Sequence, residues 1–219
     1  LKRFYLEARA VSLLDHPNIV RVYDFGVDEE HQIPFIAMEF LAGDDMRTML
    51  FQRDRLPERE ACYLISQIAK ALTNAHEHGV IHRDLKPANI HIRKLSEGDL
   101  HCKVLDFGIA KVLKGEQAES NSGLTGTGMA MGTALYMSPE QILGKDLDFR
   151  TDLYSLGCML YECLAGEVPY PGEDVAVLVR HLDENIPQLP DQLIDGLAPT
   201  DELRRTLNAM MSKDRLTRP

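Results

Sequence analysis

The chain has 219 residues, of which 44% are hydrophobic and 26% charged, the usual balance of a globular protein with a sizeable core. It carries 24 basic and 34 acidic side chains, a net charge of −10. Because the average field of such a chain repels phosphate groups, the composition argues against a nucleic-acid-binding protein.

Membrane-spanning and disulfide-rich classes are also disfavoured. The longest apolar stretch, at 153–166, is too short and too polar for a membrane span, which needs about 20 apolar residues. The cysteines form no CxxC pair and no zinc-spaced cluster with histidine; they are Cys62, Cys102, Cys158 and Cys163. We therefore expect no membrane segment in this chain, and reduced thiols in a reducing compartment.

Hydrophobic periodicity and breaker residues predict an early region that mixes a helix with strands. The predicted elements are a helix over 1–14, strands over 19–27 and 34–40, and a glycine-containing connector over 41–45. His16 and Pro17 end the first helix, because a residue before proline disfavours the helical conformation.

The remainder of the chain is predicted to be mainly helical. Helices are expected over 45–52, 57–79, 151–165, 174–183 and 201–212, with short strands at 89–92 and 101–107 and a long loop at 111–132. In the 57–79 helix, apolar residues recur at i, i+3, i+4 and i+7, and Pro57 and Gly79 suit its two ends. The 151–165 helix is strongly apolar, so we expect it at the buried centre of the second half.

The stretch HRDLKPAN at 82–89 concentrates groups suited to phosphoryl transfer. Asp84 can accept a hydroxyl proton, Lys86 can neutralise a transferring phosphoryl group, and Asn89 can coordinate a metal through its amide oxygen. These side chains reach one small volume only if the chain turns sharply, and Pro87 favours that turn. A solvated charged loop is the alternative, but the complete pattern between a long helix and two strands favours phosphoryl transfer.

HRDLKPAN, the later DFG at 106–108 and MGTALYMSPE at 131–140 together resemble the signature of eukaryotic-type serine/threonine protein kinases, most of all bacterial members. The resemblance implies an α+β, two-lobed protein-kinase-like fold with an incomplete small β lobe and a mainly helical large lobe. It implies a remnant of the small lobe at 1–38, a hinge at 39–43 and a large lobe at 44–219, with an activation segment at 106–140.

By this resemblance, Asp84 is the catalytic base, Lys86 faces the phosphate and Asn89 is a magnesium ligand. Asp106 would bridge Mg2+, or Mn2+ as an alternative, to the phosphates of ATP. Thr133 would hydrogen-bond near Asp84 and Lys86 and help to select serine or threonine acceptors. The implied reaction is transfer of the γ-phosphate of ATP to hydroxyl groups of proteins.

The resemblance also implies a nucleotide site. Met38 would be the gatekeeper, and Glu39 and Leu41 would offer backbone groups to adenine. His91 stands where the family usually has Leu or Met beneath the adenine ring, so altered nucleotide affinity is expected. Glu7 would pair with a strand lysine that orients the phosphates, but this chain contains no such lysine.

Further residues would support or regulate the site. The implied structural residues are His82 behind the metal-binding loop, Phe107 and Gly108 of DFG, Glu140 with its ion-pair partner Arg218, and Asp152, which hydrogen-bonds the backbone of the catalytic loop. Arg83 would bind a phosphate placed on Thr125 or Thr127. The alternative is that these threonines belong to a flexible linker.

Missing parts of the pattern bear on activity. The chain has neither a glycine-rich phosphate loop nor the strand lysine, so we expect a fragment with negligible activity on its own. A non-catalytic pseudokinase or scaffold is the alternative, and the GTALYMSPE segment disfavours a small-molecule phosphotransferase. The expected partners are protein substrates, with self-association for autophosphorylation as an option. The expected location is cytoplasmic, either free or as the cytoplasmic domain of a membrane-anchored kinase.

Overall fold

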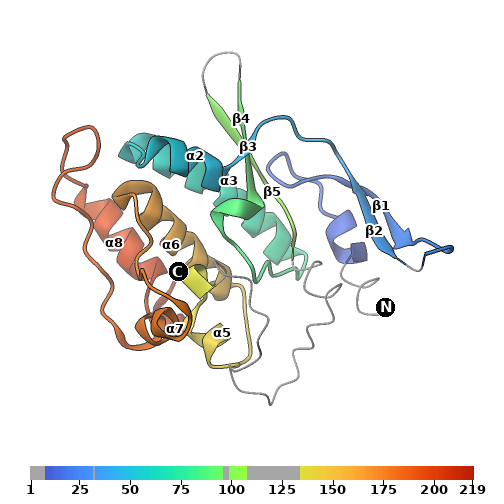
Figure 1. Cartoon of the computed structure of the whole chain (residues 1–219). Coiled ribbons are helices and arrows are strands. Elements are labelled where there is room, and N and C mark those ends of the chain that lie inside the picture. The colour runs from blue at the N-terminus through green and yellow to red at the C-terminus, as the bar shows by residue number, and fades with distance from the viewer. Residues whose placement is uncertain (1–7, 32, 96–98, 108–133) are drawn as a thin grey trace.

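The computed structural model describes residues 8–31, 33–95, 99–107 and 134–219, and Figure 1 shows a small sheet region beside a larger helical one. This arrangement confirms the predicted α+β class. Several predicted site residues lie outside the described residues: Glu7, Gly108, Thr125, Thr127 and Thr133. The loop expected at 111–132 lies outside them as well.

The small sheet consists of β1 (Val22–Val27) and β2 (Pro34–Met38), which pair antiparallel with Val27 opposite Pro34. Asp28 shapes the turn between them, because its carboxylate accepts the N–H of His31 at 2.7 Å. A helical stretch at 8–12 lies beside this sheet (Figure 1). Both strands fall within their predicted ranges.

The large lobe combines helices with a second sheet. Its helices are α2 (Met46–Arg53), α3 (Glu58–Glu77), α5 (Pro139–Ile142), α6 (Arg150–Ala165), α7 (Asp174–Asp183) and α8 (Asp201–Met210), with 3-10 turns at Pro87–Asn89, Ala134–Tyr136 and Arg215–Thr217. The sheet has the order β3 (Asp44–Asp45), β4 (Ile90–Lys94), β5 (Leu100–Val104). The prediction of a plain connector over 41–45 is wrong at its end, because Asp44 and Asp45 pair with β4.

The centre of the large lobe is α6, whose side chains are buried on nearly every side. Both α3 and α8 pack on it. The buried face of α3 includes every apolar position on which its prediction depended: Ala61, Leu64, Ile65, Ile68, Leu72 and Ala75. Gly157 lets the end of α8 approach α6 closely, since a Cβ there would lie 2.8 Å from Met211 Cγ. Among the described helices, none is both long enough and apolar enough to cross a membrane.

Part of the small lobe is joined to the large lobe by backbone contacts. Ile19 forms an isolated parallel bridge with Val104. Val20 N donates to Val104 O at 3.0 Å, and Val104 N donates to Asn18 O at 2.8 Å. The short segment 18–20 is therefore held by β5.

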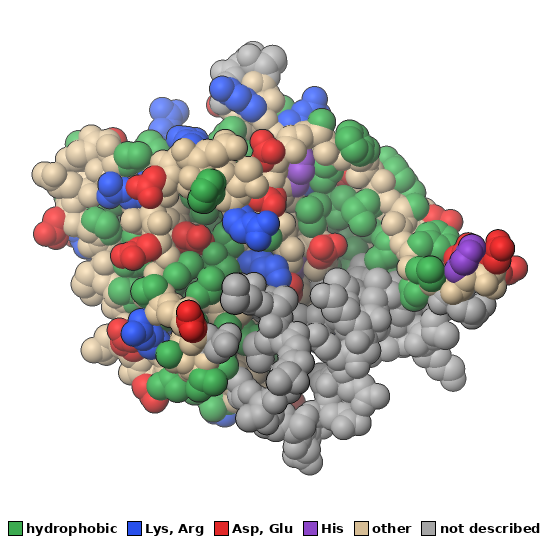
Figure 2. Space-filling view, in the orientation of Figure 1, with side chains coloured by type: hydrophobic (Ala, Val, Ile, Leu, Met, Phe, Trp, Pro, Cys, Tyr) green, Lys and Arg blue, Asp and Glu red, His purple; other side chains and the backbone are tan. Residues whose placement is uncertain are grey.

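The surface is mixed in charge. On the face in Figure 2, acidic and basic side chains of the described residues are interspersed, and hydrophobic side chains gather over the small sheet. Exposed apolar residues in and beside that sheet are Tyr23, Ile33, Phe35 and Met38.

Candidate active site

The side chains of Asp84, Lys86 and Asn89 meet at one point. Lys86 Nζ donates to Asp84 Oδ2 at 2.9 Å, and Asn89 Nδ2 donates to the same oxygen at 3.3 Å and to the Asp84 carbonyl at 2.9 Å. The 3-10 turn that begins at Pro87 reverses the chain between them. The side chain of Asp84 is 17% exposed and that of Lys86 20%, so their attraction is stronger than in open solvent.

His82 joins the 82–89 segment to the start of the DFG motif. Its Nε2 donates to the Leu105 carbonyl at 2.8 Å, and its Nδ1 accepts the N–H of Asp84 at 3.2 Å. The ring packs against Phe107, with centroids 4.9 Å apart. Burial lowers the pKa of His82, so the imidazole stays neutral and keeps one nitrogen as donor and the other as acceptor.

Asn89 and Asp106 are the candidate metal ligands. Because Asn89 Nδ2 donates to Asp84, its amide oxygen is the atom suited to a cation. Leu105 N donates to the Asn89 carbonyl at 2.9 Å, which ties the residue before Asp106 to Asn89. The described residues contain no group of three His, Cys, Asp or Glu side chains placed to hold a metal. One amide and one carboxylate fit a hard ion such as Mg2+, which takes its other ligands from phosphate and water.

Asp152, in the first turn of α6, fixes the backbone of the 82–89 segment. Its buried carboxylate accepts the N–H of His82 and of Arg83, each at 2.9 Å, as the sequence predicted, and pairs with His76 Nε2 at 2.8 Å. Arg83 has a φ of 63°, a strained value away from glycine, and Gln141 Nε2 also holds its carbonyl at 2.8 Å. His76 was not predicted as a site residue; its place in the last turn of α3, shortly before the 82–89 segment, was the available signal.

Replacing Asp152 by asparagine should lower the free energy of unfolding by about 2–3 kcal/mol, because hydrogen bonds to a charged group contribute about 1.5–3 kcal/mol and the new amide would turn a donor toward an N–H. Urea denaturation measures the change. Asp191→Asn, at an exposed position, is the matched control and should stay within about 0.5 kcal/mol of wild type. A loss no larger than that of the control would contradict the role of this carboxylate.

A buried ion pair holds the end of the predicted activation segment. Arg218 Nη1 lies 2.6 Å from Glu140 Oε1 and Nη2 lies 2.9 Å from Oε2, with side-chain exposures of 0% and 4%. This is the pair that the sequence predicted. Ser138, where the family usually has alanine, is the N-cap of α5, and its Oγ accepts the N–H of Gln141 at 3.4 Å. A helix cap is therefore the local reason for this serine.

A cavity of about 280 Å³ lies between residues 39–42 and the β4–β5 hairpin. Of the residues predicted to bind the nucleotide, Glu39, Leu41 and His91 line it, whereas Met38 does not. His91 is 9% exposed, and burial lowers its pKa despite the nearby carboxylates. Its imidazole is therefore neutral at pH 7.

Asp45, which was not predicted as a site residue, lies next to the cavity-lining residue His91 in the second sheet. It pairs with His91 across the β3–β4 ladder, and its Oδ1 accepts the N–H of Thr48 at 2.7 Å as the N-cap of α2. Its Oδ2 lies 4.0 Å from Arg47 Nη2. An aspartate directly before a helix was the available signal.

The chain is similar to known proteins over nearly all of its length. The family model described as protein kinase domain matches residues 2–219. The chain is 40% identical over 218 residues to the serine/threonine-protein kinase pkn3 of Myxococcus xanthus, which covers 99% of this chain and 39% of that protein. It is 39% identical over 226 residues to the serine/threonine-protein kinase PknB of Mycolicibacterium smegmatis, which covers 97% of this chain and 35% of that protein.

The chain thus spans less than two fifths of the length of these relatives. The match to the family model leaves out only the first residue of the chain. The small sheet region beside a larger helical region agrees with the two lobes of that family (Figure 1). The chain therefore belongs to the protein kinase domain family.

Proposed function

We propose that the chain supplies the catalytic domain of a serine/threonine protein kinase, which transfers the γ-phosphate of ATP to protein hydroxyls. The observation that carries this proposal is the convergence of Lys86 and Asn89 on Asp84 Oδ2, at 2.9 and 3.3 Å. Both named relatives are called serine/threonine kinases, which supports this choice of acceptor. Protein kinases use ATP with a divalent metal ion; Mg2+ is the proposed ion, with Mn2+ as an alternative.

In this proposal, Asp84 accepts the proton of the acceptor hydroxyl. Lys86 balances the negative charge of the phosphoryl group during transfer. Asn89 and Asp106 hold the divalent ion, which when bound supplies charge stabilisation at the phosphates. The hydrogen bonds from Lys86 and Asn89 orient the Asp84 carboxylate before the substrate binds, so little reorganisation is needed during the reaction.

The cavity beside residues 39–42 supports a nucleotide site. The proposed roles are Met38 as gatekeeper, backbone groups of Glu39 and Leu41 for adenine, and His91 beneath the adenine ring. A neutral imidazole can stack on a purine without placing an unpaired charge beneath it. The low pKa of His91 therefore supports its proposed place.

The remaining predictions are proposals of the same kind. They comprise the orientation of phosphates through Glu7, acceptor selection by Thr133, binding of a phosphate on Thr125 or Thr127 by Arg83, autophosphorylation through self-association, and the division into 1–38, 39–43 and 44–219. A cytoplasmic location is also proposed. The free thiols of the buried Cys102, Cys158 and Cys163 support it, since thiols persist in reducing compartments.

Phosphate transfer by the full-length protein tests the proposed function. The protein is incubated with γ-labelled ATP, an acceptor protein and Mg2+, and labelled residues are identified by mass spectrometry. Label is expected on serine or threonine, should be lost when EDTA removes the metal, and should return with Mg2+ or Mn2+. A folded protein that transfers no phosphate with either ion would contradict the proposal and favour a scaffold.

A further inference from the structure

Lys103, on β5, connects two segments that lead into and out of the small sheet. Its Nζ donates to Glu39 Oε1 at 2.6 Å and to the Ile19 carbonyl at 3.1 Å. The same Glu39 oxygen accepts the N–H of Arg21 at 2.8 Å, and Glu39 N donates to the Arg21 carbonyl at 2.9 Å. The side chains of Lys103 and Glu39 are 20% and 22% exposed. Glu39 is therefore held from two directions at the start of the 39–43 segment.

The backbone on either side of Lys103 is firmly anchored. Asn18 Nδ2 donates to the Cys102 carbonyl at 2.8 Å, and Cys102 N donates to Gln67 Oε1 at 3.1 Å. Val104 N donates to the Asn18 carbonyl at 2.8 Å, and both Cys102 and Val104 are 0% exposed. Lys103 is thus presented from a part of the sheet that has little freedom to move.

The 39–43 segment has few such anchors after its first residue. Phe40 is 93% exposed. Outside the strand ladders of the described chain, Phe40, Leu41 and Ala42 take part in no backbone hydrogen bond. This segment is therefore held at its two ends, by Glu39 on one side and by the pairing of Asp44 and Asp45 with β4 on the other.

We propose that Lys103 is a positioning residue for the nucleotide: its ion pair with Glu39 fixes the backbone of residues 39–41 against the cavity beneath them. This inference rests on the proposed function, in which that backbone binds adenine. Lys103 itself also lines the cavity. A backbone that is already in place when the nucleotide arrives loses less entropy on binding than a mobile one.

The ionisation of Glu39 agrees with this role. Burial alone would raise its pKa, but the hydrogen bonds from Lys103 and the N–H of Arg21 outweigh burial and lower it. The carboxylate therefore remains charged and bound to Lys103 at neutral pH. A neutral side chain of similar length at position 103 would leave this partly buried carboxylate with the Arg21 N–H alone among these partners.

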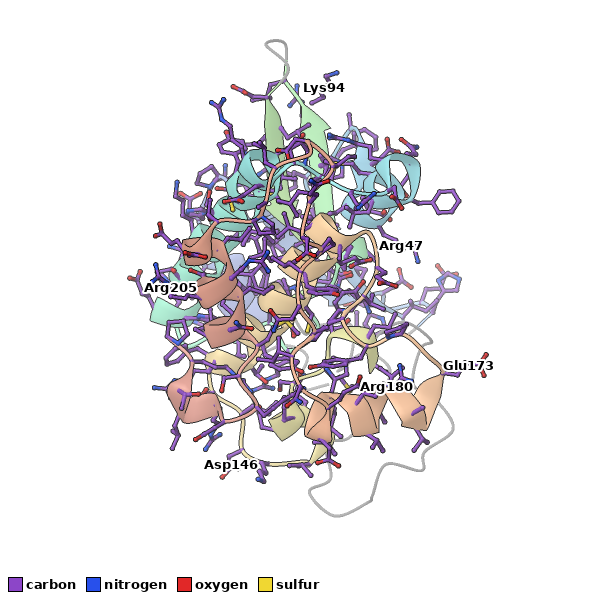
Figure 3. All side chains as sticks on the ribbon, turned by 90° about the vertical axis from the view of Figure 1, so that its left-hand side faces the viewer. Arg47, Lys94, Asp146, Glu173, Arg180 and Arg205 are labelled. Atoms are coloured by element: carbon purple, nitrogen blue, oxygen red, sulfur yellow. The ribbon has the colours of Figure 1, made fainter. Side chains whose placement is uncertain are left out.

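Lys103→Met in the full-length protein tests the proposal, with Lys103→Arg as the charge-retaining variant. KM for ATP and the Kd of a fluorescent ATP analogue should both rise about threefold to tenfold in Lys103→Met, the range expected for losing a partly buried charged hydrogen bond, whereas kcat should change less than about twofold. Lys103→Arg should recover most of the affinity. Lys94→Met is the matched control, because Lys94 is exposed near the far end of the same hairpin (Figure 3), and it should bind ATP like wild type.

Glu39→Gln provides an independent variant. It should weaken ATP binding to a similar extent, and the double variant with Lys103→Met should add little, because both substitutions remove one interaction. An unchanged KM and Kd in either folded variant, or a fall in kcat alone, would overturn the role of Lys103. Failure of the wild-type protein to transfer phosphate would instead contradict the proposed function. The Kd of the ATP analogue would still test the role of Lys103, because it does not depend on phosphate transfer.

Discussion

Replacing Arg218 by methionine should lower the free energy of unfolding by about 3–5 kcal/mol, the usual effect of removing one partner from a buried ion pair. Glu140 would keep its charge at a side chain that is only 4% exposed. Arg218 also donates to the carbonyls of Arg150 and Ser212, at 2.9 and 2.8 Å, and both would lose a donor. Urea denaturation of the purified chain measures the change.

Arg205→Met is the control for this substitution. Arg205 is exposed on α8 and projects from the surface in Figure 3, so its loss should change stability by less than about 0.5 kcal/mol. The double variant Glu140→Gln with Arg218→Met should be more stable than Arg218→Met alone, because no unpaired charge remains buried. Equal losses in the single and double variants would contradict an explanation based on charge.

The same experiment has a pH dependence with a definite sign. Burial alone would raise the pKa of Glu140, but the hydrogen bonds from Arg218 outweigh burial, so the pKa lies below its ordinary value of 4.5. A carboxyl with a lowered pKa stabilises the fold fully above the unfolded value and loses that contribution as the pH falls through the folded value. Without Arg218, the largest remaining influence on Glu140 is burial, which raises its pKa. The difference between wild type and Arg218→Met should therefore begin to shrink above pH 4.5 and continue to shrink as the pH falls through the folded value of wild type.

Asp84→Asn in the full-length protein should lower kcat for phosphate transfer by about 100-fold or more, the scale expected when a general base is lost. The amide can still hydrogen-bond Lys86 or Asn89, but it cannot take up the hydroxyl proton. KM for ATP should change little, since Asp84 does not line the cavity beside residues 39–42. Steady-state kinetics with labelled ATP measures both constants.

Asp191→Asn removes the same charge from an exposed loop and should keep kcat within about twofold of wild type. If Asp84→Asn retained near-normal kcat, the assignment of Asp84 as base would be wrong. An equal fall of kcat in Asp191→Asn would contradict a local effect at Asp84 and would indicate that the change in net charge lowers kcat. Matching thermal denaturation curves for the three proteins would show that the comparison concerns folded enzymes.

The sequence predicted the structure best where neighbouring residues determine it. The apolar positions of α3 lie on its buried face, because a helix that packs one side on a core repeats its contacts every three to four residues. Asp84, Lys86 and Asn89 could be expected to converge, since a single turn containing Pro87 is enough to bring them together. In both cases the information lies within a few turns of chain.

Contacts between distant segments were not predictable in the same way. Asp44 and Asp45 form β3 only because β4 supplies hydrogen-bonding partners from far along the chain, and aspartate alone disfavours a strand. The contact of His76 with Asp152 and that of Lys103 with Glu39 depend on how separate elements pack. The contacts of Asp152 and Arg218 could be predicted, although their partners lie far away in the chain, because each residue belongs to a sequence motif that resembles the family pattern.

The contacts of Lys103 also have a mechanical consequence. One ammonium group contacts Ile19 and Glu39, and Arg21 and Glu39 also bond each other directly, so the segments before and after the small sheet are joined side by side next to Lys103. A rigid sheet that is attached along one line can rotate only about that line. Any swing of the small sheet over a bound nucleotide would then be one rotation with Lys103 beside its axis, and substitutions there would alter the ease of that swing more than its direction.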